Sequence, residues 1–112
     1  MDSKRKFEIL MLKDALDFLK QQDIKVIKKI RNNIDKAKET SDTRLFKKLV
    51  NTDIWEFRTS LNRMEYRLLA FWDKTQNKLV VVSNGFVKKS QKTPEKEIKK
   101  AEQIMKLYYK QK

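Results

Sequence analysis

Three lysines crowd one short stretch near the C-terminal end of the sequence. Lys88, Lys89 and Lys92 fall within five positions and are followed directly by Thr93 and Pro94. Like charges at this spacing repel one another, and the sequence shows no structural purpose that would offset the repulsion. Ammonium groups gathered in a loop attract phosphate groups. The stretch is therefore a candidate loop for binding a polyanion.

The charge of the whole chain points the same way. Its 112 residues carry 28 Lys and Arg against 15 Asp and Glu, a net charge of +13. The last quarter, residues 85–112, is the most basic part, with 9 basic and 3 acidic side chains, an excess of 9 − 3 = +6. A small chain with this charge favours a phosphate-rich or acidic partner.

Two missing residue types limit the possible chemistry. The sequence has no cysteine and no histidine, so thiolate and imidazole metal sites and a cysteine nucleophile are excluded. Catalysis would have to use Lys, Arg, Tyr, Glu or Asp, and we expect neither a metal nor a cofactor. No apolar run approaches the ~20 residues of a membrane span, and charge interrupts the N-terminus too often for a signal peptide. We expect a cytoplasmic protein.

The first third of the chain predicts a strand and two helices. A length of 112 residues with 39% apolar content suits one compact domain, residues 1–112. Residues 5–10 fit a short strand. Apolar residues then recur every three to four positions over residues 11–19 and again over 24–37, which predicts a helical hairpin with Asp23 as the N-cap of its second helix.

The remainder predicts strands and a final helix. Residues 54–59, 66–72 and 78–86 are aromatic or β-branched and are separated by short polar loops, which favours antiparallel hairpins. Thr93 can cap a last helix, with Pro94 at its first position and an apolar stripe reaching Tyr108. The predicted fold is a small α+β domain of order β-α-α-β-β-β-α, with a twisted, largely antiparallel sheet and its helices on one face.

Two arginines fall on neighbouring predicted strands. Arg58 and Arg67 alternate with core residues, and a helix-free sheet face with this basic rim would form a groove for an RNA strand. In the alternative interpretation Arg58 pairs with Glu56 or Glu65. We favour core roles for the aromatic residues, which are Trp55, Phe57, Phe71 and Trp72. We also favour a solvated outer face for the basic residues of the hairpin, which are Lys28, Lys29, Arg31, Lys36 and Lys38.

The C-terminal two-thirds of the sequence resembles a known family. The marks are FKKL at 46–49, an aromatic-E-x-R at 55–58, YR at 66–67 and GFxKKxxKTPxxEIxxA at 85–101. These motifs are similar to the HigB-like, phage-derived branch of the RelE/ParE type II toxin superfamily. The last motif matches over 17 positions and is the most specific. The resemblance implies a RelE-like fold over the single domain.

The resemblance also implies an activity. A toxin of this kind is a metal-independent endoribonuclease that cleaves mRNA during translation in the ribosomal A site and so inhibits translation. A ribose 2′-hydroxyl attacks the adjacent phosphate, and arginine suits the charge that develops there. The implied partners are mRNA, the ribosome and a cognate HigA-like helix-turn-helix antitoxin, and we expect the free toxin to be monomeric.

The family motifs assign roles to particular residues. Arg67 follows the aromatic residue of the YR motif and is the implied stabiliser of the transition state. Lys89 and Lys92 are implied catalytic residues, since a lysine crowded by like charges favours proton transfer. Of the two C-terminal tyrosines we expect Tyr108 to pack and Tyr109 to be the freer, catalytic one. Implied contacts to RNA are Lys47, Lys48, Arg58 and Lys88. Asn84 stands where relatives often have histidine, and Ser90 where they often have threonine.

Other functions stay open at this point. A non-catalytic RNA-binding or ribosome-binding protein would need only the charge and the groove. A ParE-type inhibitor of DNA gyrase shares the superfamily, although the HigB-like motifs argue against it. A DNA-binding regulator fits least, because the chain shows no helix-turn-helix pattern with a turn glycine.

Overall fold

The computed structural model describes residues 7–112 as one mixed sheet with helices on both faces. Its elements are β1 (Glu8–Met11), α1 (Lys13–Lys20), α2 (Ile24–Glu39), β2 (Phe46–Lys48), β3 (Trp55–Leu61), β4 (Met64–Trp72), β5 (Leu79–Lys88) and α3 (Glu95–Lys110). The strand order is β1-β5-β4-β3-β2, and all pairings are antiparallel except β1 with β5. The α+β prediction is confirmed, with β2 as an additional strand. Of the predicted first strand, residues 5 and 6 lie outside the described part.

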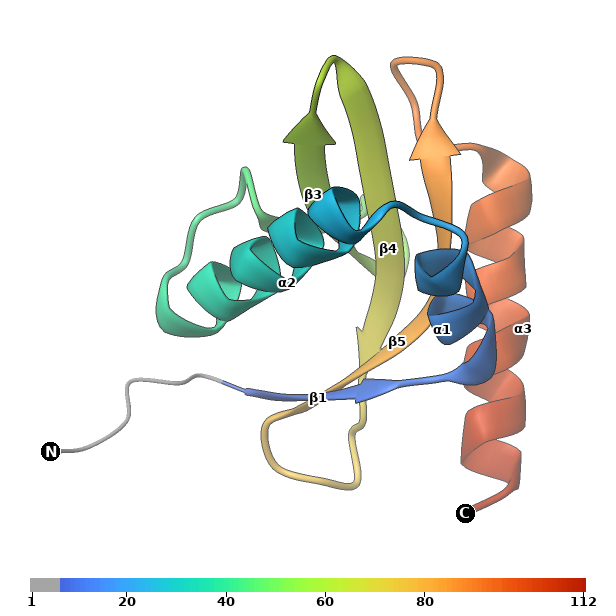
Figure 1. Cartoon of the computed structure of the whole chain (residues 1–112). Helices are drawn as coiled ribbons and strands as arrows, with labels where there is room; N and C mark the ends of the chain where they lie inside the picture. Colours follow the sequence, from blue (N-terminus) through green and yellow to red (C-terminus); the bar gives the residue numbers. More distant parts are fainter. Residues whose placement is uncertain (1–6) are drawn as a thin grey trace, which may run out of the picture.

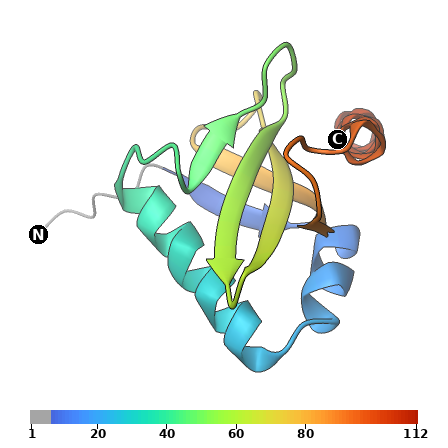
Figure 2. The ribbon, with the colours of Figure 1, turned by 90° about the horizontal axis from the view of Figure 1, so that it is seen from above.

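The helices lie on opposite faces of the sheet, as Figures 1 and 2 show. Leu68 and Ala70 of β4 pack in one cluster with α1 and α2, whereas Leu69 and Phe71 pack in a second cluster with α3. The prediction that all helices share one face is therefore wrong. Its physical reason is that β4 is apolar on both faces, so each face has to be covered.

The hairpin between β3 and β4 sets the register of the candidate site. Asn62 and Arg63 both have positive φ, 51° and 66°, as a two-residue hairpin turn with the twist of the strands requires. The strands therefore continue to Leu61 and Met64, further than predicted. In this register Arg58 is paired with Arg67.

A bulge in β5 changes which side chains face α3. Leu69 pairs with Asn84 but Ala70 pairs with Val82, so Ser83 is the extra residue. The Ser83 hydroxyl oxygen lies 3.1 Å from the Leu69 carbonyl oxygen. Because side chains alternate along a strand, one inserted residue reverses the faces of everything after it. The bulge thereby puts Lys88 on the same face as Arg67.

The beginnings of α2 and α3 differ in detail from the prediction. Asp23 is the N-cap of α2, as predicted, but its side chain makes no capping hydrogen bond. Pro94 takes the N-cap position of α3 rather than the first helical position, and Thr93 donates its hydroxyl hydrogen to Glu56 instead of capping the helix. Within residues 7–112, no helix has the length and apolar character needed to cross a membrane.

Candidate functional site

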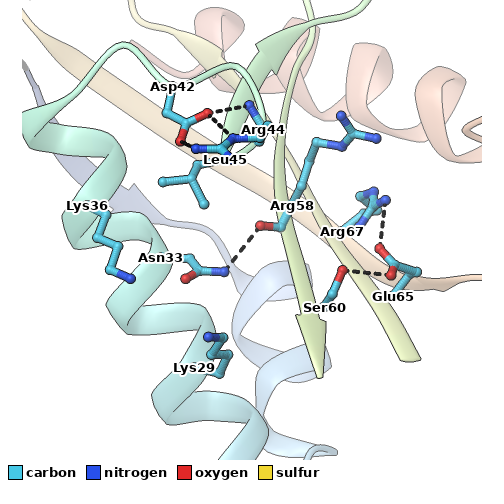
Figure 3. A pocket seen from close by; sticks show the side chains of 10 residues that line it. All are labelled: Lys29, Asn33, Lys36, Asp42, Arg44, Leu45, Arg58, Ser60, Glu65 and Arg67. Atoms are coloured by element: carbon cyan, nitrogen blue, oxygen red, sulfur yellow. Dashed lines mark hydrogen bonds and ion pairs between the residues drawn. The ribbon is translucent and has the colours of Figure 1, made fainter. Parts of the chain in front are cut away.

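Arg67 lies at the centre of a polar cluster on the sheet. Its side chain is only 5% exposed, and its Nη2 lies 3.0 Å from Oε1 of Glu65 (Figure 3). Its Nη1 donates to the carbonyl of Tyr66 at 3.0 Å. Its Nε is buried without a hydrogen-bond acceptor, since the nearest carboxylate oxygen, from Glu56, is 3.6 Å away. One guanidinium N–H of Arg67 is therefore buried without a hydrogen-bond acceptor, beside the carboxylate of Glu56.

Glu56 is a buried carboxylate beside this guanidinium. It is 3% exposed, and its Oε1 also lies 3.7 Å from Nε of Arg58. Its Oε2 accepts a hydrogen bond of 2.5 Å from Thr93. From the sequence, Glu56 is expected only as a possible partner of Arg58, and that pair is present. The sequence feature that indicates a buried carboxylate is its position between Trp55 and Phe57, on a strand whose neighbours are apolar.

Lys88 joins the cluster through the bulge in β5. It is paired with Glu65 in the ladder and is half-buried. Burial lowers the pKa of its ammonium group, and the positive charge of Arg67 lowers it further, while Glu56 acts in the opposite direction. Lys88 is therefore a better proton donor than an exposed lysine.

The loop after β5 is tied to the cluster at its end. Lys89 and Lys92 are exposed in this loop, and the Ser90 hydroxyl donates to the Lys92 carbonyl at 2.9 Å. The hydrogen bond from Thr93 to Glu56 holds the end of the loop beside the buried carboxylate. The loop and the β3–β4 turn lie at the same end of the molecule (Figure 1).

The two predicted lysines of the FKKL motif lie on β2. Lys47 is paired with Glu56 in the ladder and is exposed, so it stands at the rim of the cluster. Lys48 lines a different pocket, with Asp53 and Glu102. The structure therefore places Lys47 beside Glu56, at the rim of the cluster, and places Lys48 in a different pocket.

The C-terminal tyrosines lie far from Arg67. The Tyr109 hydroxyl donates to the Trp72 carbonyl at 2.9 Å and accepts from the backbone N–H of Lys74 at 2.9 Å. Trp72 is five residues from Arg67 along β4, about 16 Å at ~3.3 Å per residue. Tyr108 donates to Asp73 at 2.5 Å. Both hydroxyls are thus hydrogen-bonded at the opposite end of the strand, and Tyr109 is not the freer of the two.

Asn84 does not reach the cluster surface. It is 1% exposed, and its amide donates to Oε1 of Glu97 at 3.2 Å, in the first turn of α3. Its carbonyl oxygen accepts from Ser83 at 2.6 Å. The residue at this position therefore joins the bulge of β5 to the start of α3, and its contacts are structural.

A pocket of about 540 Å³ opens from the cluster. Its lining side chains come from α2, the α2–β2 loop, β3 and β4, as Figure 3 shows: Lys29, Asn33, Lys36, Asp42, Arg44, Leu45, Arg58, Ser60, Glu65 and Arg67. Two of the lysines that we expected on a solvated outer face thus share a pocket with Arg67. No group of His, Cys, Asp or Glu side chains within residues 7–112 is arranged to hold a metal ion.

Comparisons with known proteins identify the family and the fold of the chain. The model of the family described as "Phage derived protein Gp49-like (DUF891)" matches residues 17–106. The chain belongs to this family. Among solved structures it is similar to a mutant of the E. coli toxin RelE in the free state, with 16% identity and a TM-score of 0.61 over 88% of this chain and 96% of that one. A search of curated proteins gives no match. The Gp49-like chain thus has the RelE fold.

Proposed function

We propose that this Gp49-like protein is the toxin of a type II toxin–antitoxin system and a HigB-like endoribonuclease that cleaves mRNA during translation. The family and the RelE-like fold support the toxin class. The observation that carries the activity is the buried guanidinium of Arg67, which keeps one N–H without an acceptor beside the buried carboxylate of Glu56. That pair suits a phosphate that gains negative charge while a hydroxyl loses its proton.

The proposed reaction needs no group from outside the protein. The 2′-oxygen of a ribose forms a bond to the adjacent phosphorus and gives its proton to Glu56. The bond from phosphorus to the 5′-oxygen breaks, and that oxygen takes a proton from Lys88. The products are a 2′,3′-cyclic phosphate and a 5′-hydroxyl. Arg67 stabilises the pentacoordinate phosphorane through its planar fork, which never loses its charge.

The remaining cations then bind rather than react. Arg58, Lys47, Lys89 and Lys92 surround the cluster or sit in the loop tied to it, where they would contact phosphates of the bound strand. The distant position of Tyr109 gives it no part in this proposal. The proposed partners are the ribosome, mRNA and a HigA-like antitoxin. With a net charge of +13 on the toxin, binding to an acidic antitoxin surface would weaken as salt rises.

The decisive experiment maps new RNA 5′ ends after brief induction in bacteria that lack the antitoxin. We expect ends inside translated reading frames and in phase with codons. Arg67→Lys keeps the charge but loses the fork, so we expect the ends to become at least ten-fold rarer. Arg31→Ala, an exposed arginine on α2, serves as the control and leaves them unchanged. Thermal unfolding of each purified variant shows whether it is folded.

One observation favours a second function. Arg67 is already close to two carboxylates, those of Glu56 and Glu65. In a protein that only binds RNA, these carboxylates would keep the guanidinium group in position. Arrested growth without new RNA ends, combined with ribosome binding, would support that binder and contradict the nuclease. Loss of DNA supercoiling by gyrase in the same cells would instead indicate a ParE-type toxin.

A further inference from the structure

The 540 Å³ pocket extends beyond the cluster around the edge of β3. β2 pairs only with residues 55–57 of β3, and the last backbone hydrogen bond on that side runs from Arg58 N–H to the Leu45 carbonyl at 2.9 Å. Within the described residues, no strand covers the edge of β3 after this point. The pocket opens there, so it connects the Arg67 face with the side on which α2 lies (Figure 3).

The far wall of the pocket is one face of α2. Lys29, Asn33 and Lys36 are spaced i, i+4 and i+7, which puts all three on the same side of the helix. Asn33 is 8% exposed and fixes this face against β3, because its amide donates to the hydroxyl of Thr59 at 3.2 Å and to the carbonyl of Arg58 at 3.4 Å. The two lysines flank this fixed point.

The positive charges of the pocket exceed its negative charges. Its two carboxylates already have partners: Asp42 accepts hydrogen bonds from the side chain of Arg44 at 2.8 and 3.0 Å, and Glu65 pairs with Arg67. Neither Lys29 nor Lys36 forms an ion pair with any carboxylate of residues 7–112. These two ammonium groups are free to meet an anion that enters the pocket.

We propose that this pocket is a second RNA-binding subsite, in which Lys29 and Lys36 hold backbone phosphates of the mRNA strand next to the cleaved bond. The subsite rests on the proposed nuclease function. A strand with one phosphate at Arg67 has to leave the cluster, and the pocket is continuous with that position. Its volume is within the ~300–1,000 Å³ of sites that hold small-molecule ligands, so it has room for a nucleotide.

A peptide strand fits the same place less well. A strand that adds to a sheet edge needs a row of free backbone groups. Here the Arg58 N–H and carbonyl are already used by Leu45 and Asn33, and β3 ends at Leu61. Only a very short strand edge is left for a peptide to pair with. The lysines lie on the opposite wall of the pocket, so a phosphodiester chain inside it would have β3 on one side and the lysines on the other.

The first test measures binding of a fluorescent 12-nucleotide single-stranded RNA to the full chain between 50 and 200 mM salt. Each phosphate contact to a single strand contributes about −0.7 to the slope of log K against log salt. For the double variant Lys29→Ala with Lys36→Ala we therefore expect a slope shallower by about 1.4. The control removes the same charge from another side of α2, Lys28→Ala with Arg31→Ala, and keeps the wild-type slope. An unchanged slope in the first variant overturns the proposal.

A second measurement identifies the anion. On ribosomes carrying mRNA, the Lys29/Lys36 variant should raise KM more than it lowers kcat, because it loses binding rather than chemistry. An equal loss of affinity for ribosomes without mRNA would assign the phosphates to ribosomal RNA and overturn the proposal. The proposal would also be overturned if the Lys29/Lys36 variant bound an oligoglutamate peptide more weakly but bound RNA as tightly as wild type. Wild-type protein that never cleaves contradicts the nuclease itself, whereas cleavage with unchanged variant kinetics contradicts only the subsite.

Discussion

Thr93 donates a hydrogen bond of 2.5 Å to Glu56, and this contact joins the lysine-rich loop to the buried carboxylate beside Arg67. The two residues are 37 positions apart in the sequence. Thr93 immediately precedes the N-cap of α3, and Glu56 is the second residue of β3. The position of the loop and the orientation of the carboxylate are thereby coupled.

Removal of the Thr93 hydroxyl should lower activity while the fold persists. Thr93→Val keeps the shape of the side chain but leaves one oxygen of Glu56 without its donor, which costs about 1 to 3 kcal/mol in a buried site. If Glu56 accepts the proton, a misplaced carboxylate should reduce kcat on programmed ribosomes by about ten-fold or more. Thr93→Ser retains the donor and should stay within about three-fold of wild type. Equal rates for valine and serine would show that the contact is irrelevant to the reaction.

Replacement of Glu56 by glutamine separates proton transfer from structure. Glu56→Gln keeps the size of the side chain and its carbonyl can still accept from Thr93, but it cannot take up a proton as a carboxylate does. General base catalysis typically contributes 10²- to 10⁴-fold. We expect single-turnover cleavage to fall by that order, with RNA affinity unchanged or higher because a negative charge has been removed. A fall of less than three-fold would show that Glu56 is not the general base of the reaction.

The lowered pKa of Lys88 predicts a pH dependence. A general acid works in its protonated form, so cleavage should decrease as pH rises through the pKa of Lys88. Burial and the charge of Arg67 lower the pKa of Lys88 from the usual lysine value of 10.5, so the decrease in cleavage should be centred below pH 10.5. In single-turnover assays at increasing alkaline pH, Lys88→Gln should be slow throughout and should lack this decrease. Lys96→Gln, an exposed lysine in the first turn of α3, should keep the wild-type profile. A decrease that persists in Lys88→Gln would assign the acid to another group.

Local patterns in the sequence predicted most elements, because alternation and helical spacing act over few residues. The strand β2 was missed since three residues, two of them lysines, carry no alternation signal. The distribution of helices over both faces was also missed, although the uninterrupted apolar run of β4 was its signal: a strand without polar alternation needs cover on each side.

The candidate site depended on long-range register, which a single sequence does not contain. Arg67 and Arg58 could be predicted from the motifs, but the burial of Glu56 follows from strand pairing and from the loop that Thr93 anchors. Lys88 faces Arg67 only because one residue is inserted in β5. Likewise, Tyr109 belongs to a contact between the end of α3 and the end of β4, which helical spacing alone could not place.

The glycine of β5 is required by the packing of α1. A Cβ at Gly85 would lie 2.4 Å from Cδ2 of Phe18 and 2.7 Å from Cδ2 of Leu68, closer than atoms can approach. Gly85→Ala should therefore destabilise the fold by about 1 to 3 kcal/mol, the usual cost of overpacking. Chemical denaturation measures the loss. In the double variant with Phe18→Ala the closer of the two clashes is removed, so the combined loss should be smaller than the sum of the two. Strict additivity would show that the two side chains do not compete for this space.

Asp73 ties the C-terminal end of α3 to the β4–β5 turn, and its ionisation should make stability depend on pH. Burial alone would raise the pKa of its carboxyl, but hydrogen bonds from Lys112, Thr75 and Tyr108 outweigh burial and lower the pKa well below the usual value of 3.8. A carboxyl with a depressed folded-state pKa contributes stability above its unfolded-state pKa, and the contribution is lost as pH falls toward the folded-state value. Asp73→Asn should thus lower Tm by several degrees at pH 7, and the difference from wild type should narrow steadily between pH 4 and pH 2. Thr75→Ala, which removes one hydroxyl donor and keeps the charge, should lower Tm less. A Tm difference between wild type and Asp73→Asn that is independent of pH would mean that the carboxylate's charge does not stabilise this contact.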